Sequence, residues 1–297
     1  MNGPDPARGE PPPTPAHHLA AAGHRLLPTR LLARLTRAVA HCRWPWLKNP
    51  LNRFFVRRYR IDLAEAEHTD PAAYPSFNAL FTRALKAGSR PLPGDAAAVA
   101  APCDGTVSAV GTLDGEGILQ AKGHHYSAAE LLAGAAGDPH PFRNGAFMTI
   151  YLSPRDYHRI HAPRDGRLLS AVHVPGRLLT VAPAAVRALP GLFLRNERLV
   201  TVWESDAGAV AVILVGAVNV GLMETAWGGP LSPRGRWGAT PLPSNGEVAL
   251  QRGDELGRFN LGSTVILLFE DGQVAWRPEL GPGSPVRMGM EIGRIRL

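Results

Sequence analysis

The feature that most constrains the fold is a series of short apolar runs, separated by glycine and proline, that begins near Val99. The chain holds 32 glycines and 28 prolines in 297 residues, which favours turns and strands over long helices. Short apolar runs bounded by turn residues are typical of β-strands. The pattern predicts seven strands, at residues 105–110, 146–152, 168–174, 199–203, 210–218, 264–269 and 273–276.

Two local signals complete the prediction for this part of the chain. The turn sequence Glu270-Asp271-Gly272 predicts a hairpin between the last two strands. Ser127 and Glu130 have the spacing of a capping box and predict one short helix among the strands. We therefore expect an α+β fold with a β-rich domain of mostly antiparallel strands over residues 96–297.

The first 95 residues lack the strand pattern of the rest of the chain. Residues 1–24 are rich in proline, alanine and glycine and are expected to form a disordered tail. Residues 25–95 are expected to form an amphipathic helical region, with helices from Thr29 onward, over residues 51–59, and over residues 77–85 after a cap at Ser76.

No acidic residue occurs between Pro11 and Ile61, a stretch that contains ten basic residues. Such a block indicates an anionic partner or a solvated surface. Three explanations are open: the helices pack on the body, they contact a membrane surface, or they bind nucleic acid. No recognisable nucleic-acid motif accompanies the charge. Trp44 and Trp46 suit a lipid headgroup region. The longest apolar stretch, residues 209–218, is too short to span a bilayer, so we expect a peripheral protein on the cytoplasmic side of the cell membrane.

The most specific chemical signal is the Gly262-Ser263 bond just before the predicted strand 264–269. A serine hydroxyl can attack the preceding glycine carbonyl and convert the amide to an ester. Elimination then leaves a pyruvoyl group in place of Ser263. Glycine at position 262 has no Cβ and tolerates the strained backbone that such an attack requires.

A second candidate site lies in the segment from Tyr151 to Pro163. Ser153 is a good cap for a short helical turn, in which His158 and His161 would project from one face. Paired histidines can act as general base and general acid at neutral pH. A metal pair would need further ligands that the sequence does not offer nearby, and purely structural histidines are the other alternative.

Asp104 precedes a predicted strand and is followed by glycine, so it can be an ordinary turn residue. It can also be the carboxylate that orients a histidine. Asp104, His161 and Ser263 together supply an orienting group, a base and a nucleophile.

With these motifs, the chain resembles the bacterial, pyruvoyl-dependent phosphatidylserine decarboxylases. The resemblance runs in collinear order from about Asn52 to Leu297. It is carried by four stretches: residues 76–86 (SFNALFTRALK), 102–105 (PCDG), 151–163 and 259–265 (FNLGSTV).

The resemblance implies a proenzyme that cleaves itself between Gly262 and Ser263 into a β chain (1–262) and an α chain (263–297). Asp104 and His161 would activate Ser263, and the resulting pyruvoyl group would form a Schiff base with phosphatidylserine. Decarboxylation would give phosphatidylethanolamine, with His158 as a candidate for proton delivery. The resemblance also implies an αβ heterodimer that pairs into a dimer of heterodimers, an anionic membrane surface as partner, and no metal or nucleic acid.

Two alternatives stay open from the residues alone. A serine hydrolase could use Asp104, His161 and Ser263 as a standing triad, although the G-x-S-x-G elbow is missing. A non-catalytic membrane-binding module with a β-rich body would also fit the composition.

Overall fold

The computed structural model describes residues 29–121, 124–137, 140–206, 208–217, 223–231, 239–242, 247–260 and 263–296. The expected disordered tail, residues 1–24, lies outside the described residues. Gly262, on one side of the expected cleavage site, also lies outside them, whereas Ser263 is described.

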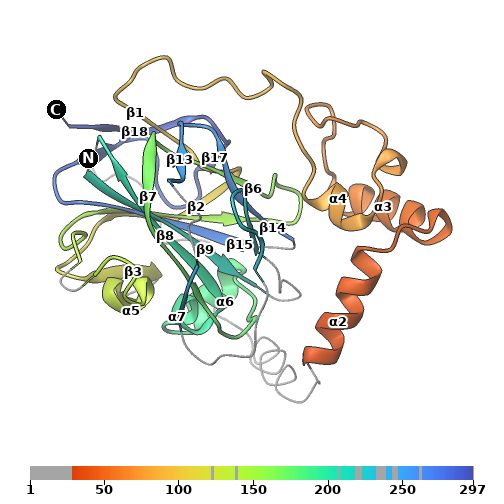
Figure 1. Ribbon diagram of the computed structural model, residues 1–297, viewed down its shortest axis with the longest axis horizontal. Coiled ribbons are helices and arrows are strands. Elements are labelled where there is room, and N and C mark those ends of the chain that lie inside the picture. The colour runs from red at the N-terminus through yellow and green to blue at the C-terminus, as the bar shows by residue number, and fades with distance from the viewer. Residues whose placement is uncertain are drawn as a thin grey trace, which may run out of the picture.

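A nine-stranded antiparallel sheet forms the centre of the molecule and contains all but one of the predicted strands (Figure 1). The strands lie in the order β12 (Thr240–Pro241), β7 (Gly166–Val174), β8 (Arg198–Ser205), β9 (Gly208–Gly216), β15 (Ser263–Phe269), β5 (Ala146–Leu152), β2 (Gly105–Thr112) and β17 (Pro285–Val286), and β13 (Ala249–Leu250) pairs with β7.

Strand β15 lies between β9 and β5, and all seven of its residues are buried. Side chains alternate between the two faces of a strand. Val265 and Leu267 pack in one apolar cluster, and Ile266 and Leu268 pack in a second cluster on the other face. Because both faces are covered, a central strand of this sheet is apolar throughout, which explains its prediction from a continuous apolar run.

Three smaller sheets complete the β-rich part. The first contains β11 (Gly229–Pro230), β10 (Met223–Thr225), β14 (Glu255–Phe259) and β6 (Arg159–His161); the second contains β1 (Ala98–Ala100), β18 (Glu291–Ile295) and β16 (Val274–Trp276); the third contains β3 (Gly117–Ala121) and β4 (His124–Ser127). The α+β fold class with mostly antiparallel strands is confirmed.

The predicted hairpin between the last two strands is wrong. The chain does turn after Phe269, but β16 pairs with β18 and not with β15. Both edges of β15 are already hydrogen-bonded, to β9 and to β5. A strand with two partners has no free edge, so the following segment joins another sheet.

Three short helices, α5 (Ala128–Leu132), α6 (Pro183–Ala188) and α7 (Leu192–Arg195), lie on one side of the central sheet (Figure 1). Their apolar side chains, Leu131 and Phe193 among them, belong to the cluster on that face. The predicted cap of α5 is confirmed, since the hydroxyl of Ser127 accepts a hydrogen bond from the backbone N–H of Glu130 at 3.4 Å.

The N-terminal region contains α2 (Thr29–Ala40), α3 (Pro45–Tyr59), the 3-10 turn η1 (Pro71–Ala73) and α4 (Phe77–Phe81), and α2 and α3 extend away from the sheet (Figure 1). Helix α3 begins six residues earlier than predicted, because Pro45 fits the first turn of a helix, where a missing N–H costs nothing. Helix α4 ends four residues earlier than predicted, because Leu85 leaves it to form a β-bridge with Ala66. Within the described residues, no helix is long and apolar enough to cross a membrane.

Candidate functional site

Ser263 begins the central strand β15 at a point where two neighbouring strands end. It lies between Leu152, the last residue of β5, and Gly216, the last residue of β9. Strand β14 ends at Phe259, four residues before Ser263. One corner of the molecule, which we call the β15 corner, thus joins the start of β15 to the ends of β5, β9 and β14.

The hydroxyl of Ser263 is fully buried and has no hydrogen-bond partner among the residues that the structure describes. By alternation along β15, Ser263 shares its face with Val265, in the cluster that also contains Ile160 of β6 and Leu256 of β14. Thr264 points to the opposite face. A buried hydroxyl without a partner costs about 1–3 kcal/mol, and such a group in a native protein calls for an explanation such as a catalytic role.

His158 lies at the same corner, in the connection from β5 to β6. Its carbonyl oxygen accepts a hydrogen bond from the backbone N–H of Phe259 at 3.1 Å. Its imidazole is fully buried and stacks on the ring of Phe81 in α4, with centroids 4.0 Å apart. Neither ring nitrogen has a hydrogen-bond partner of good geometry among the described residues, although the backbone of Ser153 and Pro154 lies close enough to oppose the effect of burial on the pKa of the ring.

Burial, and to a smaller extent the positive charge of Arg83, lowers the pKa of His158 to about 3. The imidazole is therefore neutral at physiological pH, with one nitrogen able to accept a proton. Because burial is the largest cause of the shift, any opening of the corner to water raises the basicity of His158.

His161 lies on β6, and the prediction that it shares a helical face with His158 is wrong. Segment 153–157 forms a turn, closed by hydrogen bonds at 2.7 Å from the backbone N–H and hydroxyl of Ser153 to the carboxylate of Asp156. The chain then becomes extended, because β6 pairs with β14 and places His161 opposite Glu255. Three extended residues separate the backbones of the two histidines by about 10 Å.

Both ring nitrogens of His161 have partners. Nδ1 lies 2.7 Å from the carbonyl oxygen of Gly253, and Nε2 lies 2.9 Å from the hydroxyl of Tyr157. A carbonyl oxygen only accepts, so Nδ1 carries the proton and Nε2 accepts from Tyr157. Burial lowers the pKa of His161, which keeps it in this neutral form.

The carboxylate of Asp104 bonds neither histidine. It accepts hydrogen bonds from Arg90 at 2.9 Å and from the backbone N–H of Met288 at 2.8 Å. The connection to His161 runs through the backbone, where the N–H of His161 donates to the carbonyl of Pro102 at 2.8 Å. Burial raises the pKa of Asp104, and the charge of Arg90 opposes this increase. Within the part of the chain that the structure describes, Asp104, His161 and Ser263 form no continuous hydrogen-bonded chain.

Helix α4 and the residues after it form part of the β15 corner, which the sequence analysis did not anticipate. The side-chain amide of Asn78 donates to Asn260 at 3.0 Å, three residues before Ser263. Arg83 donates to the carbonyls of Arg155 and Asp156, in the turn that leads to His158. The signal that could have shown this is an asparagine and an arginine that flank the apolar stripe of the predicted helix 77–85.

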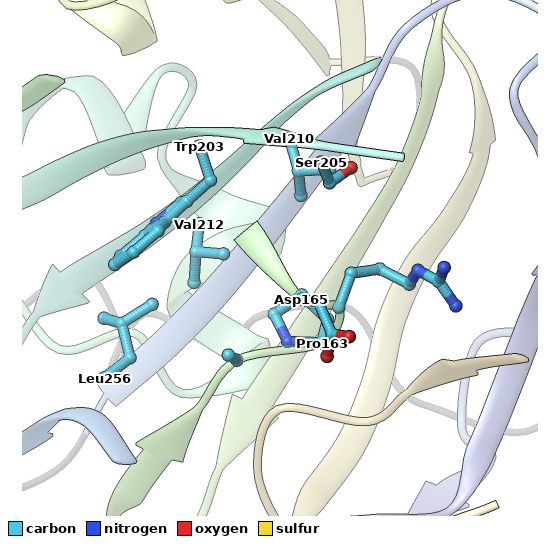
Figure 2. Close-up of a pocket in the computed structure, with 9 residues that line it drawn as sticks. Pro163, Asp165, Trp203, Ser205, Val210, Val212 and Leu256 are labelled. Carbon is cyan, nitrogen blue, oxygen red and sulfur yellow. The ribbon is translucent and has the colours of Figure 1, made fainter. Parts of the chain in front are cut away.

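A small cavity lies elsewhere in the molecule (Figure 2). It is lined by Trp203, Val210, Val212 and Leu256, and its volume of about 10 Å³ leaves room for roughly one water molecule. Val210 pairs with Phe269, at the end of β15 opposite Ser263. The cavity is therefore not part of the β15 corner. No group of three or more His, Cys, Asp or Glu side chains among the described residues is arranged to hold a metal ion.

The fold and the β15 corner define the class of protein as a β-rich enzyme. A serine hydroxyl lies buried at the start of its central strand, without a partner among the described residues, and a neutral imidazole lies at the same corner. A family model described as phosphatidylserine decarboxylase matches residues 77–294, and a second, described as PSD, matches residues 19–60. The chain belongs to the phosphatidylserine decarboxylase family, and it is a carboxy-lyase.

Curated relatives agree with this assignment. The phosphatidylserine decarboxylase proenzyme of Halorhodospira halophila is 63% identical over 281 residues, which cover 95% of each chain. The proenzyme of Ectopseudomonas mendocina is 48% identical over 275 residues, or 92% of this chain and 96% of the relative. That of Alkalilimnicola ehrlichii is 48% identical over 96% of this chain and 99% of the relative. The family predicted from sequence motifs is thus confirmed.

Proposed function

We propose that this chain cleaves itself between Gly262 and Ser263 and then decarboxylates phosphatidylserine to phosphatidylethanolamine. The observation that carries the proposal is the hydroxyl of Ser263, buried and unpartnered at the start of β15. The proenzyme name of the relatives supports a processing step.

The cleavage uses only atoms of the chain and water. The Ser263 hydroxyl oxygen attacks the carbonyl carbon of Gly262, the C–N bond breaks, and an ester replaces the amide. Loss of the α proton of residue 263 then expels the Gly262 carboxylate and leaves a dehydroalanine. Water replaces its nitrogen, ammonia leaves, and a pyruvoyl group remains at the new terminus.

His158 is the residue that we assign to proton transfer at the corner, because its imidazole is neutral, neither ring nitrogen is held by a hydrogen bond of good geometry among the described residues, and its carbonyl is fixed to Phe259. Asp104 and His161 are proposed to assist the self-cleavage. For this, His161 must give up its bond to Tyr157, and Asp104 must act from its place beside Arg90. A positioned acid or base contributes about 10²- to 10⁴-fold to such a step.

The residues of the corner fit a pyruvoyl group, since its methyl group would take the place of a buried hydroxyl that has no partner among the described residues. Such a group supplies an electron-accepting carbonyl for loss of CO₂ from an amino acid. The apolar neighbours Leu152 and Phe259 exclude water, and His158 can deliver the proton that replaces the carboxylate.

The two chains are expected to stay together as an αβ heterodimer. The smaller chain would contribute β15, which is hydrogen-bonded to β9 and β5 of the larger chain along its whole length. Strand β18 of the smaller chain likewise pairs with β1 of the larger chain. Pairing of two heterodimers is part of the same proposal.

We further propose that residues 25–95 rest on an anionic membrane surface while residues 96–297 form the catalytic domain. Large apolar side chains are exposed on α2, on α3 and between them: Leu35, Val39, Trp44, Trp46 and Phe54. Arg53, Arg57 and Arg58 line one groove with Phe54. Exposed aromatic and basic side chains together suit an interface with anionic lipid, where each basic residue adds about 1 kcal/mol. The protein would then lie on the cytoplasmic side of the cell membrane.

Two matched variants test the cleavage. Ser263→Ala removes the nucleophile and is expected to stay a single chain without decarboxylase activity. Thr264→Val removes the neighbouring hydroxyl, which is also buried and unpartnered but points to the opposite face, and is expected to be cleaved and active. Denaturing gels and release of labelled CO₂ from phosphatidylserine vesicles measure both outcomes. Turnover by Ser263→Ala would refute the proposal. A serine hydrolase would instead remain uncut and label with a phosphonate.

A further inference from the structure

Arg83 is buried at the β15 corner, where the carboxylates of Asp104 and Asp156 act on its charge without forming a direct ion pair with it among the described residues. Its side chain is only 5% exposed, and it forms no ion pair within the described parts of the chain. Nη2 donates to the carbonyls of Arg155 and Asp156 at 2.9 and 3.2 Å, while Nη1 has no partner among the residues that the structure describes. A buried cation normally has an anionic partner, because removal from water costs several kcal/mol.

Arg198 shows how this chain satisfies a buried arginine with backbone carbonyls. Its residue exposure is 4%, similar to that of Arg83. Its three nitrogens each donate to a backbone carbonyl at 2.8 Å, those of Leu131, Leu194 and Glu130. Arg83 differs because both of its hydrogen bonds come from Nη2, and its buried Nη1 has no acceptor among the described residues.

Arg83 lies next to the residues that surround the His158 side chain. The two carbonyls bonded by Arg83 belong to the turn that leads to His158. Phe81, two residues before Arg83, stacks on the His158 ring. The charge of Arg83 also acts on His158 electrostatically. A ligand that reaches His158 therefore comes within range of the Arg83 guanidinium.

We propose that Nη1 of Arg83 binds a phosphodiester oxygen of the lipid substrate. This assignment rests on the proposed function. The headgroup of phosphatidylserine carries two anionic groups, a carboxylate and a phosphodiester. The carboxylate loses its charge as CO₂ departs, so an ion pair to it would weaken in the transition state and oppose the reaction. The phosphodiester keeps its charge throughout, and arginine is well suited to phosphate oxygens.

The test compares Arg83→Gln, Arg83→Lys and the matched control Arg198→Lys as processed enzymes. A contact made equally in the ground state and the transition state changes KM and leaves kcat in place. For short-chain phosphatidylserine we expect Arg83→Gln to raise KM about ten- to hundredfold, Arg83→Lys to raise it less, and Arg198→Lys to leave it unchanged. Thermal unfolding of all three verifies that they are folded.

A second substrate shows which anionic group of the headgroup Arg83 binds. An O-alkyl serine keeps the amine and the carboxylate but has no phosphate, so Arg83→Gln should process it as the wild type does. An equal loss on both substrates, a loss confined to kcat, or no change at all would overturn the assignment. Calorimetric binding of glycerophosphoethanolamine, weakened in Arg83→Gln, gives a readout without turnover. If the wild-type enzyme did not turn over phosphatidylserine, that result would instead refute the proposed function itself.

Discussion

The imidazole of His158 stacks on the phenyl ring of Phe81, with centroids 4.0 Å apart and planes 16° from parallel. Phe81 belongs to the N-terminal helical region, whereas His158 belongs to the β-rich body. Through this stack, the N-terminal helical region contributes a side chain to the β15 corner. It also shields one face of the imidazole from water, which supports the low pKa of His158.

Phe81→Ala should weaken both stability and processing. Truncation of a buried phenylalanine typically costs about 3–5 kcal/mol, and here it also removes the support of the His158 ring. Phe142→Ala is the matched control, because Phe142 is equally buried but packs on the other face of the sheet. Urea unfolding should show similar losses for the two variants, whereas the rate of self-cleavage should fall only for Phe81→Ala. Equal rates of cleavage would show that the stack has no functional role.

The buried, neutral His158 should make the protein sensitive to acid. Its pKa is lowered from 6.5 to about 3 in the folded state, so only the unfolded state takes up its proton between these values. The free energy of unfolding therefore falls as pH decreases through this window, by about 2 kcal/mol between pH 6.5 and 5, and is unaffected above it. Chemical unfolding across pH, in the uncut Ser263→Ala background, should show this loss, and His158→Phe should lack it. Parallel pH profiles for the two proteins would exclude a buried neutral imidazole.

The ion pair between Arg90 and Asp104 should contribute more than an exposed pair of the same type. Their side chains are 9% and 14% exposed, and Arg90→Gln leaves the carboxylate with a single backbone donor. Loss of one partner of a buried pair typically costs about 3 kcal/mol. Arg167→Gln breaks a pair with Glu204 in which both side chains are more than half exposed, and should cost below about 1 kcal/mol.

Urea unfolding of these variants measures the difference. The double variant Arg90→Gln/Asp104→Asn should recover part of the loss, because it leaves no uncompensated charge. A loss for Arg90→Gln no larger than that for Arg167→Gln would show that the pair is too well hydrated to matter.

Gly105→Ala should disturb the start of β2, directly after Asp104. An added Cβ would lie 2.5 Å from the carbonyl oxygen of Tyr151 and 2.7 Å from the side chain of Ile150. Overpacking of this kind costs about 1–3 kcal/mol and should displace Asp104. Gly111→Ala on the same strand is the control, since its Cβ would approach Phe147 only to 3.5 Å. Thermal unfolding should separate the two variants, and equal melting temperatures would contradict the close packing at Gly105.

The sequence predicted the strands well because the central sheet is covered on both faces. Residues 146–152, for example, form one apolar run and become β5 without any shift of boundary. Pairing was less predictable. Strand β16 follows a turn sequence typical of hairpins, yet β15 already has two partners, and only the whole topology reveals this.

The geometry of the proposed site could not be predicted from the sequence, and the roles of its residues stay predictions. Ser263 and His158 could be singled out from local motifs, and the structure places both at one corner. The spacing of His158 and His161 indicated one helical face, but pairing of β6 with β14 overrides that local preference. Phe81 and Arg83 join the β15 corner through contacts with residues more than seventy positions away in the sequence. No local sequence pattern contains such contacts.

Intact mass spectrometry of the purified, active enzyme is the most direct test of self-cleavage at Gly262-Ser263. We expect two chains, of residues 1–262 and 263–297, with a keto group in place of the amine at the start of the smaller one. A single chain of full-length mass, in a preparation that releases CO₂ from phosphatidylserine, would contradict it.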